Sequence, residues 1–190
     1  MSPSGKPPSA SGVDFTEPVA APDTTPEAEA RARLEAEAGT PQLQKVGFYL
    51  SMNRRTRERR TPSHGDRYAI LVVEDDADLA QLVIDIFMTA GFEVHWASHR
   101  DEINREMNRR PAVDLVLLDI LLPDAHGLQI LKRIRSHPKL AKLPVIMMTG
   151  KSTAQDVAAG LTAGADGYVT KPFRMSGLVK AVQQVLGLAQ

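Results

Sequence analysis

The sequence contains no cysteine, which excludes disulfides, thiolate metal sites and a cysteine nucleophile, and fits a reducing cytosol. No apolar run reaches the roughly 18–20 residues that a membrane-spanning helix needs, and the N-terminal residues lack the apolar core of a signal peptide. The formal net charge is zero, so no global field would attract nucleic acid or an anionic membrane. For a chain of 190 residues, these absences predict a cytoplasmic protein with one ordinary domain and an appendage.

Charge is distributed unevenly and divides the chain into three parts. Residues 1–40 have three basic and seven acidic side chains, residues 41–67 have seven and two, and residues 68–190 have thirteen and fourteen. The composition also changes near Tyr68, where a polar segment gives way to short apolar runs. We therefore predict an extension over residues 1–67 and a folded domain over residues 68–190.

The extension contains few residues that could be buried. Residues 1–26 are rich in Pro, Ser, Ala and Thr, which predicts disorder, and residues 27–38 suit a short helix. The apolar cluster Val46–Met52 is able to dock on the folded domain or on a partner, but we expect disorder throughout 1–67. The basic run at 53–60 contains five arginines and is typical of a solvated linker.

From Tyr68 onward, short apolar runs alternate with helical patterns. The runs predict five buried strands, at 69–73, 92–97, 114–119, 144–149 and 167–170. Apolar spacing predicts helices that follow these strands, at about 79–90, 99–110, 128–137, 153–163 and 175–188. Continuous apolar strands alternating with helices indicate a doubly wound parallel sheet with helices on both faces. Ligands bind such sheets outside the carboxyl ends of the strands.

Polar side chains lie at or just after these carboxyl ends. The residues are Glu74, Asp75, Asp119, Thr149 and Lys171. Three carboxylates in one place repel each other and would have raised pKa values unless a cation compensates them, and one lysine supplies too little charge. Hard oxygen ligands with room for water suit Mg²⁺. The sequence therefore predicts a magnesium site at this edge of the sheet.

Four motifs carry a family resemblance: ILVVEDD (70–76), LLDILLPDAHG (117–127), VIMMTG (145–150) and GADGYVTKPF (164–173). Together they make residues 68–190, about two thirds of the chain, resemble a response-regulator receiver domain, the phosphorylated part of bacterial two-component signalling. The resemblance implies a flavodoxin-like fold with five parallel strands in the order 2-1-3-4-5. Because the sequence stops at Gln190, soon after the last predicted helix, we expect a stand-alone receiver with an N-terminal extension.

The resemblance also implies roles for individual residues. Asp119 would accept a phosphoryl group from a sensor histidine kinase, a histidine phosphotransfer protein or a small phosphodonor. Lys171 would pair with a phosphoryl oxygen, and a cis peptide bond would join it to Pro172. The implied metal ligands are Glu74, Asp75, Asp119 and the backbone carbonyl of Leu121.

Two further residues are implied to act as a switch. The Thr149 hydroxyl would donate to the phosphoryl group, and its movement would let Tyr168 turn inward. This change would remodel the face built by the fourth helix, fifth strand and fifth helix of the domain. The expected partner at that face is a downstream protein, or a second copy in a phosphorylation-dependent homodimer.

Two other functions fit parts of the sequence. The arginines of 53–60 are able to contact DNA phosphates in a transcriptional regulator, but no helix-turn-helix pattern accompanies them, so nucleic acid is not the expected partner. A phosphatase of the haloacid dehalogenase type also uses an aspartate nucleophile, Mg²⁺ and lysine. Such an enzyme needs a second aspartate where this chain has Leu121. The sequence favours a signalling protein that catalyses only its own phosphorylation and dephosphorylation.

Other conspicuous side chains are expected to have ordinary structural roles. Asp76 and Asp78 suit the first turn of a helix, where the helix dipole favours negative charge. We expect Trp96 to pack within the domain, Met147 and Met148 to belong to a buried strand, and the histidines at 95, 126 and 137 to lie at the surface.

Overall fold

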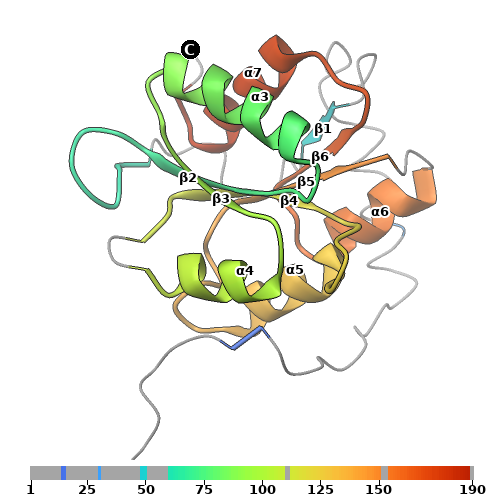
Figure 1. The fold of residues 1–190 in the computed structure, drawn as a ribbon. Helices are drawn as coiled ribbons and strands as arrows, with labels where there is room; N and C mark the ends of the chain where they lie inside the picture. Colours follow the sequence, from blue (N-terminus) through green and yellow to red (C-terminus); the bar gives the residue numbers. More distant parts are fainter. Residues whose placement is uncertain are drawn as a thin grey trace, which may run out of the picture.

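Six strands form a single sheet in the computed structural model, which describes residues 14–15, 30, 48–50, 60–109, 112–150 and 154–188 (Figure 1). The strands are β1 (Phe48–Leu50), β2 (Ala69–Val73), β3 (Glu93–Ala97), β4 (Leu115–Asp119), β5 (Val145–Thr149) and β6 (Gly167–Thr170). The described helices are α3 (Ala77–Thr89), α4 (Arg100–Met107), α5 (Gly127–Ser136), α6 (Ala154–Thr162) and α7 (Met175–Val185). The strand order is β1-β6-β5-β4-β2-β3.

The five strands of the β/α units pair in parallel, in the order β3-β2-β4-β5-β6. Counted along the folded domain, this is the predicted order 2-1-3-4-5, so the predicted fold class is confirmed. All residues of β2, β4 and β5 are buried. Burial on both faces explains why these strands have continuous apolar sequences instead of alternating ones.

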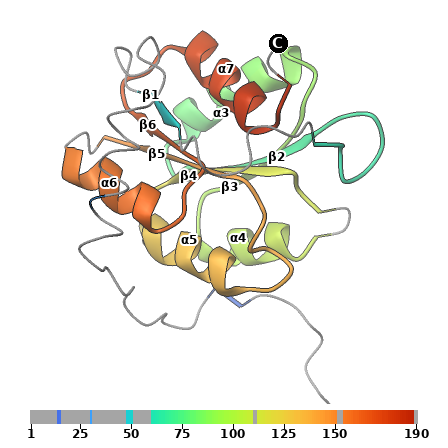
Figure 2. The ribbon, with the colours of Figure 1, turned by 180° about the vertical axis from the view of Figure 1, so that it is seen from behind.

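Helices cover both faces of the sheet, and the two views show the same layering (Figure 1; Figure 2). Helices α3 and α7 lie on one face, whereas α4, α5 and α6 lie on the other. Each layer has its own apolar core, because alternate residues of a strand point to opposite faces. Leu71 of β2 thus faces α4 and α5, while its neighbour Ile70 faces α3 and α7.

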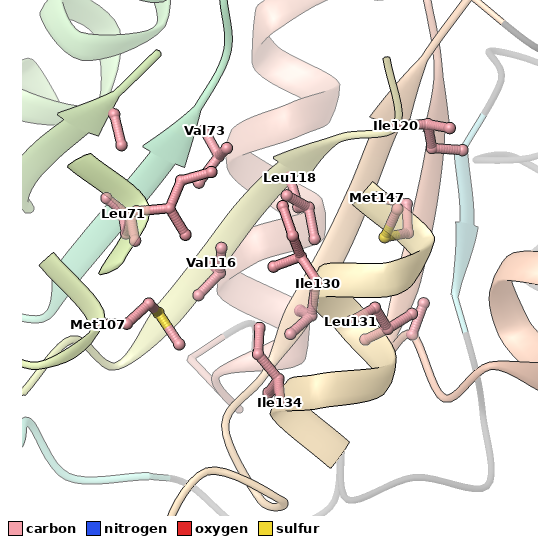
Figure 3. Packing of buried hydrophobic residues seen from close by; sticks show 14 of the residues in the cluster. Leu71, Val73, Met107, Val116, Leu118, Ile120, Ile130, Leu131, Ile134 and Met147 are labelled. Atoms are coloured by element: carbon pink, nitrogen blue, oxygen red, sulfur yellow. The ribbon is translucent and has the colours of Figure 1, made fainter. Parts of the chain in front are cut away.

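The core beneath α5 illustrates this packing (Figure 3). Ile130, Leu131 and Ile134 recur at helical spacing on α5 and face Val116 and Leu118 of β4. Each of these side chains is at most 5% exposed. Burying a side chain of this kind contributes roughly 1.5–3 kcal/mol, so this face fixes α5 and the loop before it, which connects to the end of β4.

The ends of two helices have identifiable causes. Asp76 is the N-cap of α3, and its side chain accepts a hydrogen bond from the Leu79 backbone N–H at 3.0 Å. This satisfies a donor that the helix itself leaves unpaired. Asp76 therefore precedes the first turn, in which it was expected, whereas Asp78 lies in that turn as predicted. Helix α7 ends at Val185, short of the predicted limit near residue 188, because Gly187 adopts a positive φ of 72°.

Strand β1 corrects one expectation about the extension. We expected disorder throughout 1–67, but Phe48–Leu50 forms a strand that pairs antiparallel with β6. The reason is that β6 would otherwise end the sheet with unpaired backbone groups, which a nearby extended segment is able to satisfy. The boundary between residues 67 and 68 remains a prediction. The predicted helix at 27–38, apart from residue 30, and the basic run up to residue 59 lie outside the described residues.

Other described residues of the extension also contact the folded domain. The Phe15 side chain is 6% exposed and belongs to the core cluster on the α4 and α5 face. Its backbone N–H donates to Asn104 Oδ1 on α4 at 2.7 Å. The Arg60 backbone N–H donates to the Leu186 carbonyl at 3.1 Å. No helix among the residues that the structure describes is long and apolar enough to cross a membrane.

Candidate functional site

The polar residues predicted from the sequence meet at the carboxyl edge of the sheet. Glu74 and Asp75 directly follow β2, while Asp119 is the last residue of β4. Carboxylate oxygens of these three residues lie within 4.8 Å of one another. Thr149 ends β5 and Lys171 follows β6, so each reaches the same edge from a neighbouring strand.

Lys171 is the cation of this cluster. Its Nζ donates to Glu74 Oε2 at 2.6 Å and to Asp119 Oδ2 at 2.7 Å. The other carboxylate oxygen of Asp119, Oδ1, accepts from the Leu121 backbone N–H at 3.2 Å. Both carboxylate oxygens of Asp119 therefore accept hydrogen bonds, one from an ammonium group and one from a backbone N–H. These contacts explain how the fold accommodates a carboxylate at the end of an apolar strand.

The carboxylates differ in their exposure to solvent. Glu74 is 1% exposed and Asp119 is 6% exposed, whereas Asp75 is exposed. Burial raises the pKa of Glu74, although the Lys171 ammonium opposes this shift. Burial alone would lower the pKa of Lys171, but the hydrogen bonds to Asp119 and Glu74 outweigh it and raise that pKa.

The donor set fits a small divalent cation. Three carboxylates face one ammonium, so the cluster retains an excess of negative charge when all four groups are ionised. Burial is the main cause of the raised pKa of Glu74, and the negative charge of Asp119 adds to it. Carboxylate oxygens, one of them open to water, match the preference of Mg²⁺ for oxygen ligands with part of its hydration shell retained.

The backbone around Asp119 is fixed by a close approach of helix α5. A Cβ atom on Gly127 would lie 2.2 Å from the Asp119 carbonyl oxygen and 2.8 Å from Ile120 Cα, so only glycine fits at the start of α5. The Gly127 N–H donates to the Ile120 carbonyl at 2.8 Å. A bridge between Leu121 and His126 closes the same loop. These contacts hold the segment that contains Asp119 and Leu121 in place.

Comparison with known proteins agrees with this geometry. The family model described as the response regulator receiver domain matches residues 70–183. The chain belongs to this family. Phosphorylation and Mg²⁺ binding are typical of receiver domains, and the match indicates a signalling role. It confirms the resemblance stated from the motifs.

Relatives of the receiver are found in several bacteria. It is 36% identical over 122 residues to the transcriptional regulatory protein GltR of Pseudomonas aeruginosa, covering 64% of this chain and 50% of GltR. It is also 36% identical over 117 residues to the phosphate regulon transcriptional regulatory protein PhoB of Escherichia coli, covering 62% of this chain and 51% of PhoB. The chain spans about half the length of these curated relatives.

Solved structures of receivers resemble this one. The non-phosphorylated HemR receiver domain of Leptospira biflexa is 30% identical, with a TM-score of 0.58 over 65% of this chain and 98% of that chain. The chemotaxis protein CheY4 of Vibrio cholerae is 27% identical, with a TM-score of 0.58 over 63% of this chain and 99% of that chain.

Other predicted residues of the receiver lie around the acidic cluster. The Lys171–Pro172 peptide bond is cis, the isomer that the resemblance implies. The Lys171 backbone N–H donates to the Thr149 carbonyl at 2.7 Å, which ties the ends of β5 and β6 together. Thr149 itself is fully buried, and Leu121 is 53% exposed.

Tyr168 lies in a position that the sequence alone does not predict. The resemblance implies that Tyr168 turns inward when Thr149 moves toward a phosphoryl group. Here the Tyr168 side chain is already fully buried, and its ring edge lies against the main chain of Gly160 in α6. Gly160 provides the space for the ring, and an isolated glycine within a helical pattern is the signal that could have indicated such a contact.

Sequence reasoning missed two further contacts of the site and its surroundings. Trp96, expected to pack, is 40% exposed, and its Nε1–H donates to the Glu74 carbonyl oxygen at 2.9 Å. The Glu74 N–H donates to the Ala97 carbonyl at 3.1 Å, so the end of β3 holds both backbone groups of Glu74. His95, expected at the surface, is only 12% exposed in its side chain and lies 3.0 Å from Glu93. The Trp96 contact has no sequence signal, because it depends on the register of β2 against β3. The contact of His95 with Glu93 is local, because alternate residues of a strand point to the same face.

Proposed function

We propose that this receiver accepts a phosphoryl group on Asp119 from a sensor histidine kinase or a histidine phosphotransfer protein, in the cytoplasm and with Mg²⁺. The observation that carries the proposal is the placement of Lys171. Its ammonium bridges the buried carboxylates of Glu74 and Asp119 at the edge of the sheet where three acidic residues converge. A site with this charge pattern suits the transfer of a highly charged group.

Transfer would proceed by displacement at phosphorus. A carboxylate oxygen of Asp119 attacks the phosphorus atom of a phosphohistidine, the P–N bond breaks, and its electron pair leaves with the imidazole. Lys171 already contacts Asp119 Oδ2 at 2.7 Å, so the ammonium is in place to pair with a phosphoryl oxygen on the new acyl phosphate. The Thr149 hydroxyl would donate to another phosphoryl oxygen.

The metal ligands would be Glu74, Asp75, Asp119 and the backbone carbonyl of Leu121. Mg²⁺ bound there supplies positive charge beside the phosphoryl oxygens. Asp75 is the exposed member of the cluster, so it would be the first carboxylate to meet an ion arriving from solvent. The buried Glu74 would complete the site directly or through a water molecule.

The output would be a change in a protein-interaction surface made by α6, β6 and α7. Tyr168 of β6 lies three residues before Lys171, so one strand links the site to this surface. A downstream protein, or a second copy in a phosphorylation-dependent homodimer, would bind there. New contacts of a phosphoryl group with Thr149 and Lys171 would shift the population toward the binding form.

Transcriptional regulation through DNA is the second candidate. GltR and PhoB are named as transcriptional regulatory proteins, but this chain spans only about half of each. The basic run at 53–60 lies outside the described residues except for Arg60. Phosphate contacts by these arginines would make binding strongly dependent on salt. An electrophoretic shift that stays absent at low salt would remove this candidate.

Intact-mass spectrometry after incubation with acetyl phosphate tests the main proposal. We expect one added phosphoryl group on the wild type with Mg²⁺, and none with EDTA or in Asp119→Asn. A histidine kinase domain as donor extends the test, since receivers differ in their use of small phosphodonors. Labelling of Asp119→Asn to the wild-type extent would contradict the assignment of the acceptor.

Trp96 provides a separate test of the metal site. It is the single tryptophan of the chain, and its indole N–H donates to the Glu74 carbonyl. Titration with Mg²⁺ should change the indole fluorescence along a saturating curve, and Asp75→Asn should weaken the response strongly. Asp85→Asn on the exposed side of α3 is a matched control and should titrate like the wild type. Equal curves for all three proteins would contradict a metal site at the acidic cluster.

A further inference from the structure

Strand β1 covers the edge of the sheet at β6. Its three residues pair antiparallel with β6, with Phe48 opposite Val169, Tyr49 opposite Tyr168 and Leu50 opposite Gly167. Without β1, β6 would be the last strand of the sheet, with backbone N–H and C=O groups open to pairing by another chain. Both views place β1 at this edge, beside α7 (Figure 1; Figure 2).

The chain between β1 and the folded domain is short enough to keep β1 nearby. Arg60 is fixed by its N–H bond to the Leu186 carbonyl at 3.1 Å and by the Tyr68 hydroxyl, which donates to the Arg60 carbonyl. Nine residues, 51–59, separate this anchor from Leu50. A tether of this length gives an effective concentration on the order of millimolar, so a strand of only three residues is able to stay docked.

The covered edge belongs to the strand that leads into the acidic site. Tyr168, whose ring is buried, is the partner of Tyr49 in the β1–β6 register. Val169 and Thr170 then connect Tyr168 to Lys171, which binds Asp119. On its other side, β6 pairs with β5, where Met147 is the partner of Tyr168. A strand docked on β6 therefore lies against the surface made by α6, β6 and α7.

We propose that Phe48–Leu50 is a strand docked in cis that occupies the β6 edge and keeps a second copy of this chain from pairing there. Edge strands of globular proteins are covered by such devices because an open edge is a template for association. Two copies related by a two-fold axis would present the same β6 edge to each other. The proposal does not depend on phosphorylation. It extends the proposed function in one respect: β1, a segment of the same chain, covers the β6 edge of the surface made by α6, β6 and α7.

Proline substitutions in the full chain test the proposal. Alternate residues of an antiparallel strand direct their N–H groups to the neighbouring strand, so either Tyr49 or both of its neighbours donate to β6. The triple variant F48P/Y49P/L50P removes every such donor. The matched control is F48V/Y49V/L50V, which retains all three N–H groups and has residues that favour strands.

Hydrogen exchange and light scattering on the unphosphorylated protein give the two readouts. In the proline variant, we expect those amides of 167–170 that point toward β1 to exchange about tenfold faster or more in dilute solution, while those of 69–73 are unchanged. At high concentration, we expect the proline variant to dimerise and the wild type and valine variant to remain monomeric.

Two results would overturn the proposal. Equal exchange of 167–170 in the wild type and the proline variant would mean that β1 does not cover β6. A proline variant that exchanges faster but stays monomeric at high concentration would mean that β1 does not exclude a second copy. Labelling by acetyl phosphate is measured separately on the same proteins, so loss of the proposed function would be distinguished from loss of the β1 contact.

Discussion

The ring of Tyr168 lies against Gly160, so closely that a Cβ atom at residue 160 would be 2.8 Å from Cδ2 and 2.9 Å from Cε2 of the ring. Tyr168 belongs to β6 and Gly160 to α6, two elements of the surface assigned to protein interaction. The glycine therefore sets how near α6 approaches the ring. Position 160 controls whether Tyr168 fits in its buried place.

Gly160→Ala tests this contact. Alanine in a helix normally gains roughly 0.5–1 kcal/mol over glycine, but here the added methyl group collides with a fully buried ring, and overpacking typically costs about 1–3 kcal/mol. We expect a net loss of stability in urea unfolding. In the double variant with Tyr168→Leu, the cost of Gly160→Ala should become smaller. Additive effects of the two substitutions would contradict the contact.

Two glycines beside the site should differ strongly in their response to substitution by alanine. In Gly127→Ala the methyl group would meet the Asp119 carbonyl oxygen at 2.2 Å, a backbone atom that cannot move without displacing β4. We expect a loss of more than about 3 kcal/mol, or failure to fold. In Gly150→Ala the methyl group meets nothing within 4 Å, so the free energy of unfolding should stay within about 0.5 kcal/mol of the wild type. Similar losses in both variants would contradict the close approach of α5.

The ion pair between Arg135 and Asp166 should stabilise the fold away from the site. Arg135 Nη2 lies 2.7 Å from Asp166 Oδ2, which also accepts the Val145 backbone N–H at 2.9 Å. Arg135→Met would leave the buried carboxylate without its cation, a change that costs roughly 3–5 kcal/mol. The exposed Lys180 provides the control, since Lys180→Met should change urea unfolding by less than about 0.5 kcal/mol. Equal losses of unfolding free energy in Arg135→Met and Lys180→Met would contradict a stabilising ion pair between Arg135 and Asp166.

The lowered pKa of Glu102 should make the stability of the fold depend on pH. The Ser98 backbone N–H, which donates to Glu102 Oε2 at 2.9 Å, lowers the pKa of Glu102 against the opposing effect of burial. A carboxyl with a lowered folded-state pKa stabilises the protein above its unfolded-state pKa, and this contribution is lost as the pH falls through the folded-state value. The wild type should therefore be more stable than Glu102→Gln at pH 7, by an amount that shrinks below about pH 4.5. A difference that does not change with pH would contradict this origin.

Most of the fold was predictable because its signals are local. Each parallel strand has an apolar run, and each following helix has its own spacing, so the five β/α units were found without their contacts. The residues of the site were also predictable, because the strand ends place Glu74, Asp119 and Lys171 at one edge of any such sheet. The roles assigned to these residues came from the resemblance and remain part of the proposed function.

The features that sequence reasoning missed depend on distant contacts. Strand β1 forms because β6 has an open edge, and the sequence around Phe48 contains no sign of that edge. The bond from Trp96 to the Glu74 carbonyl needs the register of β2 against β3, which pairs Val72 with Trp96. The buried place of Tyr168 needs a glycine on a helix that lies eight residues earlier in the chain.

Chemical trapping of the acyl phosphate would test the central claim most directly. The full-length protein would be incubated with acetyl phosphate and Mg²⁺ and then treated with borohydride, which reduces an aspartyl phosphate to homoserine. Peptide mapping would locate the reduced residue. We predict homoserine at position 119, and none there when EDTA replaces Mg²⁺. Homoserine at Asp75 or at another aspartate, with Asp119 unmodified, would contradict the account.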